Sequence, residues 1–208
     1  NTNFHNNTTT FTSHIYRYTT WSSLQKVVRS QLKKGSGGSG YEILLPGCGS
    51  SSLGSHLYKE GYTNITCIDT SKVVISQMTD HYSDLDQMEY TTMDATHMEF
   101  IPENCFDLII DKALFDCMLT TANNMTTVTN LVKEMYRVLK PGGSYIMISH
   151  SPPEAREPFL KGDNNCYDWK IKTEQIAKPP ISGGEDVGEK PADAILWAYI
   201  CKKGASKF

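Results

Sequence analysis

The 208-residue chain lacks the features that would direct it to a membrane or to nucleic acid. No apolar run approaches the ~18 residues that a membrane-spanning helix needs. Its 20 Lys and Arg are outnumbered by 23 Asp and Glu, so there is no basic surplus to bind a phosphate backbone. We therefore expect neither a membrane protein nor a nucleic-acid-binding one.

The cysteines also lack a pattern that would suggest a structural site. None of the six forms a C-x-x-C pair, and none of the six histidines stands at metal-ligand spacing from a cysteine. No metal site is predicted. Unpaired cysteines within expected strands behave as small apolar residues, which favours a reduced, cytoplasmic protein over a disulfide-stabilised secreted one.

We expect one domain preceded by a short arm. Residues 1–15 are rich in Asn and Thr and too polar to pack alone, so they are predicted to form a flexible N-terminal arm. Residues 16–208 are long enough for a single domain with its own core. Within this domain, apolar residues at helical spacing predict a helix ahead of a Gly/Ser-rich linker at 35–40.

Beyond this linker, strand-like and helix-like segments alternate. The last of the helices is long and is expected to stop at Pro141-Gly142-Gly143. Such alternation favours an α/β fold with a parallel sheet and helices on both faces. The final third alternates apolar and polar residues instead, which predicts an antiparallel hairpin at the sheet edge. Strands are expected at 42–46, 65–69, 89–93, 106–110 and 144–149, and the hairpin strands near 167–171 and 195–199.

The most informative segment runs from Glu42 to Leu53. An apolar run enters the turn Gly47-Cys48-Gly49 and leaves as an amphipathic helix, and the next predicted strand ends in Asp69. Such a unit presents backbone N–H groups and a helix N-terminus to an anionic group, and a carboxylate to ribose hydroxyls. The segment therefore predicts a cofactor that contains adenosine.

Two classes of cofactor fit this turn poorly. A dinucleotide fingerprint would have a third glycine at position 52, where this chain has Ser52, and a phosphate-binding P-loop would have Gly-Lys-Ser/Thr, which is absent. S-adenosylmethionine is smaller and needs only the close backbone approach and the ribose acid. An NAD-dependent oxidoreductase is the alternative that the missing glycine disfavours.

Further motifs follow in order along residues 16–201. Five motifs stand in this order: Leu45-Pro46-Gly47-Cys48-Gly49-Ser50, Ile68-Asp69-Thr70-Ser71, Met93-Asp94-Ala95, the run from Phe106 to Lys112, and the run from Arg137 to Gly143. Together these resemble class I, seven-stranded S-adenosylmethionine-dependent methyltransferases. The resemblance implies a Rossmann-like, doubly wound, mostly parallel seven-stranded sheet that binds S-adenosyl-L-methionine.

Three shorter stretches narrow the resemblance. They are Ser50-Ser51-Ser52-Leu53, Val73-Val74-Ile75 and the run from Asp111 to Asp116. These are similar to the branch that contains the elongation-factor-1-alpha lysine methyltransferases, including the methyltransferase linked to endothelin-converting enzyme. This narrower resemblance implies a lysine side chain of a protein as the methyl acceptor.

The resemblance also implies roles for residues of the turn and of the strand ends. Gly47 and Gly49 would form the floor under the methionyl part of the cofactor. Asp69 would accept hydrogen bonds from the ribose hydroxyls, with Thr70 beside it.

The remaining roles concern the base and the sides of the cofactor. Asp94 and Ala95 would flank the adenine, and Lys112 would lie against the cofactor. An aromatic residue of the N-terminal segment would close over it, Tyr18 ahead of Tyr16 or Trp21.

The chain departs from the family pattern at three positions. Leu45 replaces the acid two residues before the first glycine, Ser52 stands in place of the third loop glycine, and Ala113 stands where close relatives usually have Gly.

Methyl transfer to a lysine requires an unprotonated amine, although the ordinary pKa of lysine is about 10.4. A carboxylate that orients the amine while its proton leaves would serve. Asp111 is the first candidate for this catalytic role, with Asp116 second and His150 third, and Arg156 lies on a segment that could face the acceptor. The alternative for Asp111 is that it caps the next segment or holds Lys112.

The sequence thus predicts a methyltransferase that acts on a protein lysine. A small-molecule N-, O- or S-methyltransferase is one alternative, and a non-catalytic cofactor-binding subunit is another. The partner is accordingly a protein substrate or a small-molecule acceptor, and the oligomeric state is open.

Overall fold

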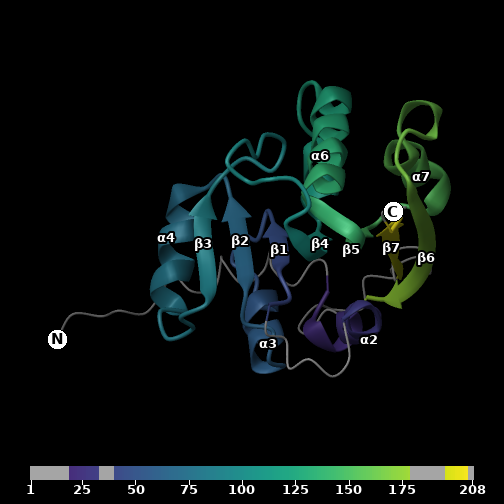
Figure 1. Cartoon of the computed structure of the whole chain (residues 1–208). Helices are drawn as coiled ribbons and strands as arrows, with labels where there is room; N and C mark the ends of the chain where they lie inside the picture. The colour runs from purple at the N-terminus through teal and green to yellow at the C-terminus, as the bar shows by residue number, and fades with distance from the viewer. Residues whose placement is uncertain (1–18, 33–39, 179–194, 206–208) are drawn as a thin grey trace, which may run out of the picture.

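A computed structural model of the chain describes residues 19–32, 40–178 and 195–205. Within them one seven-stranded sheet has the order β3-β2-β1-β4-β5-β7-β6 (Figure 1). Neighbours from β3 to β5 pair in parallel, whereas β7 runs antiparallel to both β5 and β6. The mostly parallel sheet with an antiparallel hairpin at its edge is confirmed. The strands are β1 Ile43–Pro46, β2 Ile65–Asp69, β3 Met88–Thr92, β4 Phe106–Lys112, β5 Leu139–Ser149, β6 Trp169–Ala177 and β7 Ile195–Lys203.

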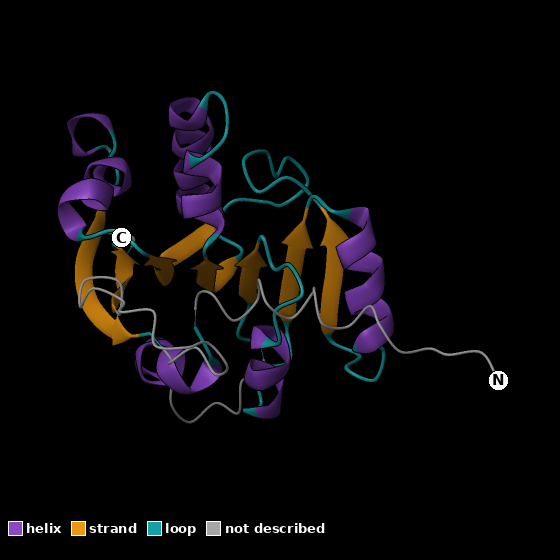
Figure 2. Cartoon of the chain, turned by 180° about the vertical axis from the view of Figure 1, so that it is seen from behind, coloured by secondary structure: helices purple, strands orange, loops and turns teal. Residues whose placement is uncertain are grey.

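Helices cover both faces of the sheet. Successive residues of a strand point to opposite faces, so Ile43 belongs to one buried cluster and Leu44 to the other. Helices α2 and α3 contribute to the first cluster and α6 and α7 to the second. Figures 1 and 2 show these two pairs of helices on opposite sides of the sheet. The helices are α2 Trp21–Gln31, α3 Leu53–Lys59, α4 Lys72–His81, α5 Leu114–Leu119, α6 Asn124–Val138 and α7 Pro153–Lys161, with a 3₁₀ turn at Asp163–Asn165. No helix within these described residues is long and apolar enough to cross a membrane.

The start of α4 is fixed by a side-chain cap. The hydroxyl oxygen of Ser71 accepts a hydrogen bond from the backbone N–H of Val74 at 3.3 Å, which satisfies one of the free donors of the first helical turn. Ile75 and Met78 are buried on one face of the helix. This cap fixes α4 directly behind the end of β2, where the predicted ribose acid stands.

The boundary between α6 and β5 differs from the prediction. Helix α6 ends at Val138 and β5 begins at Leu139, so Pro141-Gly142-Gly143 lies within the strand and is not the turn before it. The pairing with β4 shifts register between Phe106 and Leu108, which absorbs the extra residues of β5. The segment is therefore an irregularity in a paired strand, a feature that Pro and Gly often mark.

Candidate active site

The parallel strands of the sheet end at one edge, and a cavity of about 290 Å³ lies there. This is where open α/β sheets bind ligands. Five of the predicted cofactor residues line it, namely Gly47, Asp69, Thr70, Ala95 and Lys112. The other lining residues are Met93, Ala113, Leu114, Cys117 and Met118.

The glycine turn brings backbone close to the wall of this cavity. Gly47 and Gly49 have φ angles of +57° and +50°, a conformation that L-residues with side chains rarely adopt. A Cβ atom on Gly47 would lie 2.7 Å from Cδ1 of Leu114, whereas one on Gly49 would meet nothing within 4 Å. Only the first glycine is therefore required by packing. The second does not line the cavity but donates a backbone hydrogen bond to Asp69, the predicted ribose acid.

Asp69 joins the two turns that border the cavity. Its Oδ2 accepts from the backbone N–H of Gly49 at 3.0 Å, and its Oδ1 accepts from the N–H of Ser71 at 2.9 Å. An ionised carboxylate has about four acceptor positions, so half of them remain for hydroxyl donors. The half-buried side chain is thus fixed in orientation and still able to bind a ligand.

Asp94 does not line the cavity. Its Oδ1 accepts from both the backbone N–H and the hydroxyl of Thr96, each at 2.8 Å, which closes a local turn. The following loop is held on α6 because Arg137 donates to the carbonyls of Met98 and Ile101 at 2.8 and 2.7 Å. The adenine contact of Asp94 stays a prediction.

Asp111 is fully buried and does not line the cavity. Its Oδ1 accepts from the N–H of Leu114 at 2.8 Å, and its Oδ2 accepts from the N–H of Phe115 at 3.1 Å and from the Tyr145 hydroxyl at 3.2 Å. Burial raises the pKa of this carboxyl to about 7, against the opposing effect of these hydrogen bonds. These contacts favour the alternative that it caps the following segment, and its role as a catalytic base stays a prediction.

Lys112 reaches the cavity from the end of β4, where Asp111 precedes it. Burial lowers the pKa of its ammonium, and the charge of Asp111 opposes this shift. The cation is thus poorly hydrated, a state in which a polar ligand group gains more from contact with it.

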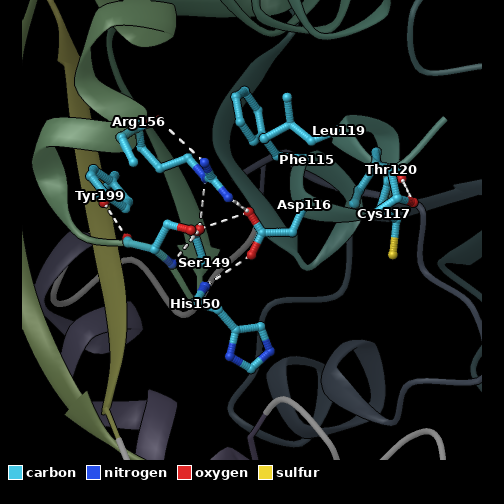
Figure 3. A network of polar contacts seen from close by, with 12 residues as sticks. Phe115, Asp116, Cys117, Leu119, Thr120, Ser149, His150, Arg156 and Tyr199 are labelled. Carbon is cyan, nitrogen blue, oxygen red and sulfur yellow. Dashed lines mark hydrogen bonds and ion pairs between the residues drawn. The ribbon is translucent and has the colours of Figure 1, made fainter. Parts of the chain in front are cut away.

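Asp116 and Arg156 form an ion pair away from the cavity wall (Figure 3). Both side chains are largely buried and tie α5 to α7. His150 follows β5 and is exposed, and its imidazole points away from Asp116 in Figure 3. Partial burial of the ring and the charge of Lys178 lower the pKa of this imidazole, which favours its neutral form. Of the three acid–base candidates, only His150 has an exposed side chain.

Sequence reasoning missed the wall that α5 builds. Leu114, Cys117 and Met118 line the cavity, and they stand at positions i, i+3 and i+4. This spacing places residues on one face of a helix, so the signal was present in the sequence. Only six residues carry it, which is too short a window to distinguish it from a loop.

The predicted closing residues Tyr18 and Tyr16 lie outside the described residues, as does the predicted arm at 1–15. Trp21, the third candidate, begins α2 and stacks on His56 of α3 with ring centroids 5.6 Å apart. It therefore serves to dock these two helices. Within the described residues, no group of three or more His, Cys, Asp or Glu could hold a metal ion.

The chain matches one family model and is similar to several known proteins. A model described as a methyltransferase domain matches residues 44–147. The chain is 35% identical over 139 residues to the eEF1A lysine and N-terminal methyltransferase of Homo sapiens, a match covering 65% of this chain and 20% of that protein. It is 30% identical over 138 residues to EEF1A lysine methyltransferase 4 of Mus musculus, covering 62% of this chain and 53% of that protein. The chain thus spans about half or less of these relatives.

A solved structure supports the fold. The SAM-dependent methyltransferase of Methanosarcina mazei superposes with a TM-score of 0.61 at 17% identity, covering 86% of this chain and 98% of that one. At this identity the likeness concerns the architecture of the sheet and helices alone.

Proposed function

Because this chain belongs to the methyltransferase domain family, we propose that it transfers a methyl group from S-adenosylmethionine to a lysine side chain of a protein. The observation that carries the proposal is the convergence of the Gly47 turn and the oriented carboxylate of Asp69 on one cavity at the strand ends. The first offers close backbone approach and the second offers acceptors for a pair of hydroxyls.

The residues of the cavity fit the parts of this cofactor. Asp69 would accept from the ribose hydroxyls through the acceptor positions that Gly49 and Ser71 leave open. Met93 and Ala95 lie beyond the end of β3 and offer an apolar surface for the adenine. Lys112 would lie against the cofactor on the side of β4.

The bound cofactor supplies a methyl group already activated by its sulfonium, so the protein's task is to align an unprotonated acceptor amine with it. His150 is suited to take the proton from that amine. The residue follows β5, next to β4, and is exposed, and its lowered pKa favours the neutral imidazole that can accept a proton. Asp111 and Asp116 are less suited because the fold engages both of their carboxylates.

The substrate proposal is supported by the relatives, whose names assign them to eEF1A lysines. We accordingly propose elongation factor 1A as the first acceptor to test and the cytoplasm as the place of reaction.

The test incubates the purified chain with isotopically labelled S-adenosylmethionine and recombinant elongation factor 1A, followed by mass spectrometry of its peptides. A labelled lysine that disappears in the matching Lys→Arg substrate supports the proposal. Label in a small molecule of cell extract, with unlabelled protein, would instead indicate a metabolite methyltransferase. Cofactor binding without any labelled product would indicate a non-catalytic subunit.

A further inference from the structure

Helix α5 forms one wall of the cavity, but it is too short to be stable without contacts to the rest of the fold. It has only six residues, and a helix of this length is not stable by itself in water. Leu114, Cys117 and Met118 face the cavity. Contacts on the other side of the helix must therefore fix where this wall stands.

Asp116 lies on that other side. Two helical residues turn through about 200°, so a residue two positions after Leu114 points to the opposite face. The carboxylate of Asp116 accepts from the hydroxyl of Ser149 at 2.7 Å, from Nη2 of Arg156 at 2.9 Å, and from its Nε at 3.0 Å. Figure 3 shows these groups converging on one carboxylate.

The second carboxylate oxygen is also engaged. Oδ2 of Asp116 accepts from the backbone N–H of His150 at 2.9 Å. Nε of Arg156 further donates to the Ser149 hydroxyl at 3.0 Å, and the guanidinium lies over the ring of Phe115, 5.7 Å from its centroid. Three elements thus meet at one buried ion pair: α5, the end of β5, and α7.

The two charged side chains are shielded from water, so the geometry of their ion pair affects the position of α5. The side chain of Arg156 is 13% exposed and that of Asp116 is 11% exposed. A buried ion pair with satisfied hydrogen bonds holds a defined geometry, whereas loss of one partner leaves an uncompensated buried charge. A small shift of α5 would move all three of its cavity residues together.

We propose that Asp116 and Arg156 are positioning residues that hold α5 against the end of β5 and thereby set the width of the cofactor cavity. This inference rests on the proposed function, because it takes S-adenosylmethionine as the ligand of that cavity. Neither residue touches the cofactor in this arrangement. They act through Leu114, Cys117 and Met118.

The experiment measures the Kd of S-adenosylhomocysteine, the demethylated product, by calorimetry for the full chain and for Asp116→Asn, Arg156→Met and the double variant. We expect each single change to raise Kd about tenfold or more, a loss of about 1.4 kcal/mol of binding free energy, because the uncompensated buried charge displaces the cavity wall. The double variant should bind better than the product of the two single effects predicts, because neither charge is then left unpaired.

A matched control pair lies at the opposite end of the strands. Lys140 and Asp107 form an ion pair at 2.6 Å, with side chains 32% and 13% exposed. Lys140→Met and Asp107→Asn should lower the melting temperature and leave Kd within about twofold. If an Asp116 variant does not fold, Ser149→Ala is tested in its place. It removes one hydroxyl from the same network and should raise the Kd of S-adenosylhomocysteine by a smaller factor.

The kinetic readout distinguishes positioning from catalysis. In the Asp116 and Arg156 variants the donor KM should rise by a larger factor than kcat at saturating donor falls, because Asp116 contacts His150 only through its backbone N–H. An unchanged Kd in variants that lose as much stability as the control pair would overturn the inference and leave the proposed function intact. Absence of binding by the unmodified chain would overturn the proposed function itself.

Discussion

The backbone N–H of Gly49 donates a 3.0 Å hydrogen bond to Oδ2 of Asp69, which stands twenty residues further along the chain. The other oxygen of the same carboxylate accepts from Ser71 at the start of α4. One side chain at the end of β2 therefore holds the glycine turn after β1 and the helix that follows β2. The ribose acid of the proposed site is also the residue that assembles the site.

The first prediction concerns the change Asp69→Ala. A hydrogen bond to a charged group contributes about 1.5–3 kcal/mol, so loss of the ribose contacts should weaken S-adenosylhomocysteine binding about 10- to 100-fold or more. The two turns lose their acceptor as well, which should lower the free energy of unfolding by about 1–3 kcal/mol. Calorimetry and urea unfolding measure the two effects.

Ser71→Ala is the control for this prediction. It removes the N-cap of α4, at a cost of about 1 kcal/mol, without removing a proposed ribose acceptor. Its binding affinity should stay within about twofold of the unmodified chain. An Asp69→Ala variant that binds as tightly as Ser71→Ala would remove Asp69 from the ribose site.

The second prediction compares Gly47→Ala with Gly49→Ala. Both place a methyl group on a backbone of positive φ, which costs about 1–2 kcal/mol. Only Gly47→Ala also overlaps Leu114, and overpacking adds about 1–3 kcal/mol. Urea unfolding should therefore show the larger loss of stability for Gly47→Ala.

Leu114→Ala tests the cause of that difference. In the double variant Gly47→Ala/Leu114→Ala the contacts with Cδ1 and Cγ of Leu114 are removed and only the 3.0 Å contact with its Cβ remains, so the alanine at position 47 should cost less stability there than it costs beside Leu114. Equal losses for the two single glycine variants would contradict the packing argument.

Local signals explain how much of this architecture the sequence could predict. The glycine turn, the strands β1 to β4 and Asp69 at a strand end are encoded in short stretches, and each was placed within two residues. Five residues named as cofactor contacts line one cavity because parallel strands end at one edge.

What could not be predicted depends on tertiary packing. A strand-end carboxylate can point outward to a ligand or inward to a helix, and the sequence does not distinguish Asp69 from Asp111 in this respect. The carboxylate of Asp111 points inward, where it accepts a hydrogen bond from the hydroxyl of Tyr145, 34 positions away. The start of β5 at Leu139 likewise depends on a pairing with β4 that absorbs Pro141-Gly142-Gly143.

The third prediction is that Ala113→Gly stabilises the chain. Ala113 precedes α5 with φ +83°, a left-handed conformation that costs a non-glycine residue about 1–3 kcal/mol. Glycine removes this cost but loses about 0.4–1 kcal/mol through the entropy of the unfolded chain. The free energy of unfolding should therefore rise by about 1 kcal/mol in urea titration.

Ala155→Gly is the control and should change the free energy of unfolding in the opposite direction. Ala155 is exposed within α7, where glycine is about 1 kcal/mol less favourable than alanine. A loss of stability in both variants would show that position 113 carries no strain.

The last prediction follows from the buried carboxyl of Asp111. Its pKa in the folded chain, about 7, is higher than the ordinary aspartate value of 3.8. Between these values the folded chain binds more protons than the unfolded chain, so stability falls as pH rises, with a slope of at most about 1.4 kcal/mol per pH unit for one proton. The stabilising contribution of the protonated form is thus complete below about pH 4 and lost as pH rises through about 7.

Asp111→Asn isolates this effect because its amide does not titrate. Urea unfolding at several pH values should show the stability of the unmodified chain falling relative to Asp111→Asn from about pH 5 to pH 8. Tyr145→Phe removes a hydrogen bond that lowers the pKa of Asp111, so in that variant the same fall should move to higher pH. A stability difference that does not change with pH would mean that Asp111 stays ionised inside the fold, with its two backbone donors and Tyr145 outweighing the loss of hydration.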